Sequence, residues 1–271
     1  MKRPNVLLVM CDQFRGDCLS FDGHPDVKTP YLDTLAADST YFENAYSACP
    51  SCIPARTGLF TGKKPASHGR TGYQDGVAWE YDHMMAEEFC SHGYQTACVG
   101  KMHVHPPRLQ CGFQTLKLHD GYIGYYRKAN LPYYMHQNVS DDYMRYLKDH
   151  LGEFADVNGS GVENNSWITH PWIYEESYHP TNWVVDESIH FLETRDRTKP
   201  FFLMTSFVRP HPPFDAPNTY FELYRDKKLR EPAHGEWVDP ILCEQDGMII
   251  DSIHGCRDTA MRHEAMAGYY A

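Results

Sequence analysis

Two apolar runs that each end in polar residues constrain the fold of this 271-residue chain more than any other feature. Residues 5–11 are almost wholly apolar before Asp12, and residues 201–208 form a second such run before Arg209. Runs of this length without polar alternation are typical of strands buried on both faces of a parallel sheet. The carboxyl ends of such strands are where open α/β sheets bind ligands. The sequence therefore predicts an α/β fold with functional polar residues after each strand.

Helical segments separate these strands. Thr29 is a plausible N-cap and Pro30 suits a first helical turn, which gives a helix whose apolar face comprises Tyr31, Leu32, Leu35 and Ala36. Residues 104–180 are rich in Tyr, Asn, Gly and Pro and have weak periodicity, so we expect long loops and insertions there. Further helices are predicted over residues 54–60, 84–91, 183–193 and 257–271, with a short strand over residues 95–99.

Charge and composition exclude several classes of function. The formal net charge of −11 argues against a general nucleic-acid binder, although a few local cations would suffice for an anionic substrate. Nine cysteines, an odd number, indicate free thiols in a reducing compartment. No apolar run approaches the ~20 residues of a membrane span, and no signal peptide is evident. We expect no membrane partner and a cytoplasmic location, or a secreted or periplasmic one if a leader has been removed.

The segment SACPSCIPARTGLFTG, residues 47–62, concentrates chemistry at a predicted helix start. A cysteine in an apolar context is ordinarily a packed thiol, and that interpretation applies to Cys52 taken alone. Pro54, however, marks a first helical turn, where unpaired backbone N–H groups and the helix dipole favour an anion. Arg56 adds a planar cation one turn further on. This combination suits transfer of a tetrahedral oxyanion group.

The same residues resemble the signature of the type I sulfatase family, C-x-P-x-R followed by T-G, here Cys52 to Arg56 and then residues 61–62. Similar stretches lie at residues 4–12, at TPYLDTLAADSTYFENAYS, at GYQTACVGKMHV and at FVRPHPPFDAP. The resemblance implies an α/β, alkaline-phosphatase-like layered sheet with helices on both faces. Residues 1–271 would then be an incomplete N-terminal catalytic domain, with an insertion-like region at about 104–180.

The resemblance also implies the activity, a sulfuric ester hydrolase. A maturation enzyme would oxidise Cys52 to formylglycine, whose hydrate provides one hydroxyl to attack sulfur and a second to expel sulfate. Asp12, Gln13 and residue 52 would hold a divalent metal, with calcium first and Mg²⁺ or Mn²⁺ as alternatives. Without the resemblance, Asp12 reads as a turn or capping acid. Gln13 departs from the commoner pair of acids and resembles members that cleave phosphonate monoesters or phosphodiesters, so that alternative stays open.

Three further residues take catalytic roles by the same resemblance. Lys101 would hold the sulfate oxygens, His103 would bond to the formylglycine diol, and His211 would contact the ester oxygen and protonate the leaving group. The alternatives without a catalytic role are that Lys101 is a surface lysine and His103 a half-buried histidine. Arg209 is expected at the surface rather than on the anion. A tyrosine cluster would either line a sugar or aryl pocket or pack an insertion; it comprises Tyr122, Tyr125, Tyr126, Tyr133 and Tyr134.

One expected family feature has no match. The second metal-ligand pair, Asp followed by His or Asn after a later strand, is not seen, since Asp251 to His254 has the wrong spacing. The final RHEAMAGYYA resembles the helix before that strand, so the chain reads as truncated before that strand and the C-terminal subdomain. We expect weak metal binding and an exposed sheet edge that favours a homo-oligomer. An inactive fragment that binds anions or a partner is the alternative to an enzyme acting on carbohydrate or aryl sulfate esters.

Overall fold

The computed structural model describes residues 3–120, 141–162, 165–233, 235–236 and 258–271. Contacts divide the chain into two units, each taken by itself below. The first unit comprises Met1–Asp12, Ala45–Asp156 and Pro180–Val208, and the second comprises Gln13–Asn44, Val157–His179 and Arg209–Ala271. The predicted tyrosine cluster at residues 122–134 and the segment 251–254 lie outside the described residues.

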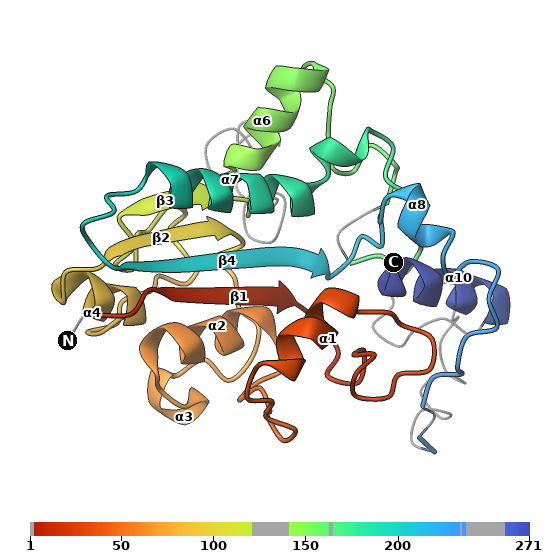
Figure 1. Ribbon diagram of the computed structural model, residues 1–271, viewed down its shortest axis with the longest axis horizontal. Helices are drawn as coiled ribbons and strands as arrows, with labels where there is room; N and C mark the ends of the chain where they lie inside the picture. Colours follow the sequence, from red (N-terminus) through yellow and green to blue (C-terminus); the bar gives the residue numbers. More distant parts are fainter. Residues whose placement is uncertain (1–2, 121–140, 163–164, 234, 237–257) are drawn as a thin grey trace. The chain divides into compact units, whose positions relative to one another are not determined.

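A four-stranded sheet forms the frame of the first unit (Figure 1). Its strands follow the order β1-β4-β2-β3, where β1 is Val6–Asp12, β2 is Gln95–Gly100, β3 is Thr115–Leu118 and β4 is Phe201–Pro210. Strand β2 runs parallel to both β3 and β4, and Val99 of β2 lies beside Thr205 of β4. The predicted α/β class with a parallel sheet is confirmed, and both 95–99 and 201–208 are strands as expected.

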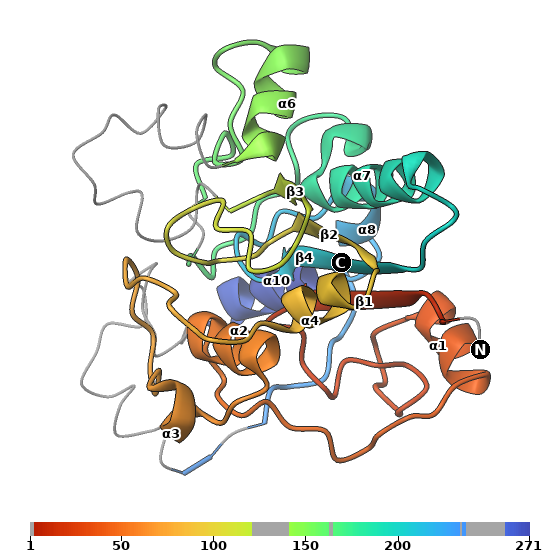
Figure 2. The ribbon, with the colours of Figure 1, turned by 90° about the vertical axis from the view of Figure 1, so that its left-hand side faces the viewer.

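Helices cover the two faces of this sheet (Figures 1 and 2). Helix α7 (Pro180–Thr194) lies on one face, and α2 (Cys52–Thr61) and α4 (Met85–Ser91) lie on the other. The alternation of side chains along β4 explains both contacts. Thr205 meets Ser188 of α7 with 3.0 Å between their hydroxyl oxygens, whereas Phe202 stacks on Phe89 of α4 with 4.3 Å between ring centroids.

The main hydrophobic core fills the space between the sheet and the α2/α4 side. Phe60 of α2 is 2% exposed and packs edge-on against Trp79 and Phe113, while Phe202 from β4 is 1% exposed. Burying an aromatic or aliphatic side chain of this size contributes about 1.5–3 kcal/mol. This core therefore anchors α2, and with it Cys52 at the first residue of that helix.

Strand β1 differs from its prediction. We expected residues 5–11 to be buried on both faces, but β1 is an edge strand of the described sheet and its residues alternate in exposure. Leu8 and Met10 pack on the core, whereas Leu7 is 53% exposed and Val9 is 56% exposed. An apolar run shows that a strand can be buried on both faces, but neighbouring elements decide whether it is.

The region predicted to be long loops contains regular structure. Within residues 104–180, β3 pairs with β2 and α6 (Asp142–Leu151) contacts β3. Asp141 caps α6 by accepting from the backbone N–H of Met144. The weak periodicity of this range did not reveal β3 and α6, because these elements are short and tertiary contacts stabilise them. The first unit also contains α3 (Pro65–His68).

The second unit contains α1 (Pro30–Ala37), η2 (Glu176–Tyr178), α8 (Asn218–Phe221) and α10 (Thr259–Tyr270). Helices α8 and α10 meet around a small cluster in which Phe221 is 2% exposed and Ala267 is fully buried. Helix α1 begins at Pro30 as expected, but its predicted apolar face is not covered, since Leu35 is 62% exposed. No helix among the described residues is both long enough and apolar enough to span a bilayer.

Candidate active site

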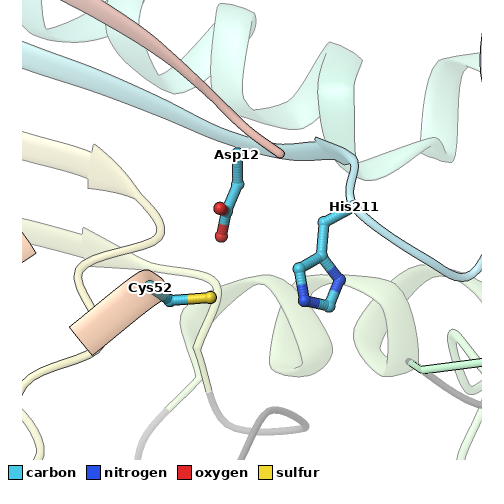
Figure 3. A group of neighbouring side chains, drawn as sticks. All are labelled: Asp12, Cys52 and His211. Atoms are coloured by element: carbon cyan, nitrogen blue, oxygen red, sulfur yellow. The ribbon is translucent and has the colours of Figure 1, made fainter. Parts of the chain in front are cut away.

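The first unit gathers polar side chains at the carboxyl ends of β1 and β2. Asp12 is the last residue of β1, and Lys101 and His103 follow directly on β2. Cys52 faces the same region because α2 begins there, after Ser51 in extended conformation (φ −143, ψ 137). Figure 3 shows the Asp12 carboxylate and the Cys52 thiol directed into one space, and their ligand atoms lie within 4.8 Å of each other. This is the edge at which parallel sheets bind ligands.

The start of α2 gives Cys52 an electropositive setting. The first backbone N–H groups of a helix have no intrahelical partner, and the helix dipole places partial positive charge there. No acidic residue lies in the first turn, and Ser51 makes no side-chain capping bond. A negative charge on residue 52, or on an anion beside it, is therefore favoured.

Two buried cations converge on one carboxylate oxygen. The Lys101 side chain is fully buried and pairs with Asp12 Oδ2, and the Arg56 guanidinium lies 3.8 Å from the same oxygen. Arg56 is held by donating to the Lys101 carbonyl (2.6 Å) and to Ser206 Oγ (3.1 Å). Because burial weakens solvent screening, these cations act strongly on an anion in the same space. Lys101 is buried and therefore not a surface lysine, and its catalytic role stays a prediction.

His103 is held in an uncommon conformation beside Cys52. Its backbone has φ +58, which non-glycine residues seldom adopt, and its N–H donates to Asp120 Oδ2 at 2.7 Å. Its Nε2 lies 3.3 Å from Asp75 Oδ1. Burial lowers the pKa of His103, but hydrogen bonding to Asp75 and Cys52 outweighs it, so that the pKa lies above its usual 6.5. Non-glycine residues in such conformations cluster at functional sites.

Sequence reasoning missed two acids of this site. Asp75 contacts the His103 ring, and Asp120 accepts from the backbone N–H groups of Met102 and His103. Asp75 lies in GYQDGV, which reads as a turn, and no spacing pattern connects it to His103. Only the tertiary structure brings these residues together.

The second unit holds the remaining predicted residues, whose roles at the site stay predictions. Gln13 adopts φ +62, and its carbonyl accepts from Tyr269 Oη at 2.7 Å. His211 is buried, and its Nδ1 lies 2.8 Å from the Pro212 carbonyl. Since a carbonyl only accepts, this contact assigns the hydrogen to Nδ1.

Arg209 was expected at the surface, and the structure corrects this. Its side chain is 13% exposed and forms a two-pronged ion pair with the buried Asp215, at 2.5 Å from Nε and 2.6 Å from Nη2. Burial raises the pKa of Asp215, but the charge and hydrogen bonds of Arg209 together with the contact from His179 outweigh burial and lower the pKa to about 2. The Arg209–Asp215 ion pair joins the two ends of the loop that carries His211. Arg209 is buried because Asp215, close to it in the sequence, balances its charge.

A divalent metal would find few ligands among the described residues of the first unit. Asp12 and residue 52 are the predicted ligands there, and Asp12 Oδ2 is already paired with Lys101. Calcium takes about six to eight oxygen ligands. These two side chains fall well short of such a shell, so we assign no chemical step to a metal from them.

Fold and site together define an alkaline-phosphatase-like α/β protein with a potential nucleophile, two buried cations and a histidine at the carboxyl edge of its sheet. Solved structures agree on the fold. A phosphonate monoester hydrolase of Agrobacterium radiobacter aligns with a TM-score of 0.68 at 24% identity, over 99% of this chain and 56% of that one. A second such hydrolase, from Silicibacter pomeroyi, aligns with a TM-score of 0.70 at 21% identity and the same coverage.

Sequence comparisons then identify the family. A family model described as Sulfatase matches residues 4–263. An arylsulfatase of Clostridium perfringens is 46% identical over 268 residues, 99% of this chain and 56% of the relative. An ulvan-active sulfatase of Formosa agariphila is 30% identical over 84% of this chain and 39% of the relative. The chain belongs to the sulfatase family of the alkaline phosphatase superfamily, whose members generally use a divalent metal and formylglycine. It spans 56% of the length of the first relative and 39% of the second.

Proposed function

We propose that this chain carries the nucleophile and anion-binding side chains of a sulfatase that hydrolyses a sulfate ester through a formylglycine formed from Cys52. The supporting observation is the placement of Cys52 at the start of α2, beside the buried cations Arg56 and Lys101. The relative named arylsulfatase favours an aryl sulfate as substrate, and the one named ulvan-active sulfatase favours a carbohydrate sulfate as the alternative.

The proposed reaction requires the protein mainly to supply positive charge and to position the reacting groups. A hydrated formylglycine supplies one hydroxyl that takes the sulfate group and a second that, on losing its proton, restores the aldehyde and releases sulfate. Arg56 and Lys101 hold the sulfate oxygens by charge, and their burial preserves that attraction in salt. His103 contacts residue 52 and orients its hydroxyl. His211 is proposed to protonate the leaving oxygen.

The cofactor and partner assignments are proposals, and family membership supports a divalent metal and formylglycine in general. We propose calcium as the metal, with Asp12, Gln13 and residue 52 among its ligands, and a formylglycine-generating enzyme as the maturation partner. A cytoplasmic location and a homo-oligomer are also proposed. The exposed apolar side chains of β1, Leu7 and Val9, supply surface for association.

The test expresses the protein from its whole reading frame together with a formylglycine-generating enzyme. Mass spectrometry of the peptide containing Cys52 is expected to show a loss of about 18 Da, since the CH₂SH group becomes an aldehyde. Hydrolysis of an aryl sulfate and a sulfated sugar should accompany it. Cys52→Ala should abolish both conversion and hydrolysis, whereas the matched Cys49→Ala should retain them. Full conversion without turnover of either sulfate ester would overturn the proposal.

A second function is favoured by one observation, the Asp12-Gln13 pair in place of two acids. A carboxamide adds an oxygen ligand but no charge. Parallel rates on an aryl sulfate and an aryl phosphonate monoester separate the two functions. A higher kcat/KM for the phosphonate would assign the chain to phosphonate ester hydrolysis.

A further inference from the structure

His103 is held by two acids that act on different parts of it. Asp120 accepts from the backbone N–H of His103 and from that of Met102, at 2.7 and 3.0 Å, and so fixes the main chain after β2. Asp75, from the loop before Trp79, contacts the imidazole ring instead. The ring and the backbone are therefore positioned by separate groups, and each can be tested alone.

The Asp75 contact favours one of the two ring nitrogens as the one that carries hydrogen. His103 Nε2 lies 3.3 Å from Asp75 Oδ1, and both side chains are largely buried, at 8% and 15% exposure. An ionised carboxylate only accepts, so its proximity favours hydrogen on Nε2. A neutral ring with hydrogen on Nε2 keeps Nδ1 as an acceptor, and Cys52 also interacts with this ring. A hydroxyl on residue 52 would need that acceptor.

Tyr73 in turn orients Asp75. The Tyr73 hydroxyl donates to Asp75 Oδ2 at 2.6 Å, so that the two carboxylate oxygens are divided between Tyr73 and His103. The Tyr73 ring also meets the His103 ring edge-on, with 6.0 Å between centroids. The carboxylate cannot rotate away from His103 without losing the tyrosine bond. The same loop thus supplies both the acid and the group that holds it.

We propose that Asp75, held by Tyr73, is a positioning residue that sets the tautomer and orientation of His103 toward residue 52. Asp75 does not touch the substrate in this role and acts only through His103. The effect on turnover rests on the proposed sulfatase function, whereas the effect on the His103 ring does not.

The first experiment reads the ring directly. Nitrogen-15 NMR of histidine-labelled chain, with the His103 signals assigned by their loss in His103→Gln, should show hydrogen on Nε2. Asp75→Asn should shift the ring toward the other tautomer or a mixture, because a carboxamide can donate as well as accept. The matched control is Asp22→Asn, since Asp22 also accepts from a tyrosine, Tyr41 at 3.2 Å, within the other unit. His103 signals unchanged in Asp75→Asn, or altered equally by the control, would overturn the proposal.

The second experiment reads turnover of an aryl sulfate by the protein expressed from its whole reading frame and matured. Asp75→Asn should lower kcat on the order of 10- to 100-fold and change KM less than about twofold, as expected for a group that orients another. Asp75→Glu should restore part of the loss, and Tyr73→Phe should lower kcat less. A raised KM with unchanged kcat would overturn the proposal by making Asp75 a substrate-binding residue. If the wild type turns over no sulfate, the proposed function fails while the NMR result still decides the role of Asp75.

Discussion

Gly100 gives the sharpest test of how the fold supports the site. It ends β2, immediately before Lys101, with φ +98, and a Cβ built there would lie 1.9 Å from the Ser206 carbonyl oxygen. That oxygen accepts from the Lys101 N–H at 2.9 Å. Gly100→Ala must therefore move β2 away from β4 and break this hydrogen bond. The perturbation acts on the segment that presents Lys101.

The expected loss in the free energy of unfolding has two parts, and a matched variant separates them. An L-residue at positive φ costs roughly 1–2 kcal/mol. Unpairing a buried hydrogen-bonding group adds about 1–3 kcal/mol for each partner left unsatisfied. Gly93, which precedes β2 with φ +82, would bring a Cβ only to 3.5 Å from Arg3 Nη1, an ordinary contact. Gly93→Ala should therefore lose only the backbone part, and Gly100→Ala roughly 2–6 kcal/mol more, because two partners lose their hydrogen bond.

Urea unfolding at neutral pH measures both losses, with m-values compared to detect any change in the unfolding transition. Equal destabilisation by the two variants would refute the steric argument. A Gly100→Ala protein of near wild-type stability would show that β2 and β4 can separate at this point without cost.

Three further predictions concern charged side chains and the groups that they bind. The folded pKa of Asp215 is about 2 against 3.8 for a free carboxyl, so the ionised carboxylate contributes about 2 kcal/mol that is complete above pH 3.8 and lost as pH falls toward 2. Asp215→Asn should destabilise at pH 7, and its deficit in urea unfolding should shrink on acidification; a deficit that stays constant down to pH 2 contradicts this. Arg56→Lys should cost roughly 1–3 kcal/mol, because one ammonium cannot replace the bonds to the Lys101 carbonyl and Ser206; thermal unfolding checks it, and no loss would show these bonds to be dispensable. Asp120→Asn should lower the free energy of unfolding by about 1.5–3 kcal/mol in the same assay, since charge-assisted bonds to two backbone N–H groups weaken. An unchanged unfolding midpoint would mean that the segment after β2 keeps its stability without these bonds.

Local signals in the sequence predicted the elements that carry the site. Pro54 marks the start of α2, and the apolar runs before Asp12 and Arg209 mark β1 and β4. These signals work because capping, proline geometry and apolar periodicity act within a few residues. The start of α2 was placed only approximately, two residues after its observed beginning at Cys52, since helix ends depend on capping geometry.

Contacts between distant segments could not be predicted in this way. The exposed face of β1 depends on which elements cover Leu7 and Val9, and an apolar pattern cannot state that. Arg209 read as a surface residue because nothing in the sequence indicates that Asp215 is buried against it. Tertiary packing sets both outcomes.

The sequence by itself determined the α/β class and the family, since each depends on short-range pattern and residue identity, and it predicted Cys52 as the nucleophile. Only the tertiary structure decided that Arg56 and Lys101 both lie against Asp12, and that Asp75 contacts the ring of His103. The physical reason is that electrostatic partners are chosen by distance and burial in space, and the order of residues along the chain constrains neither.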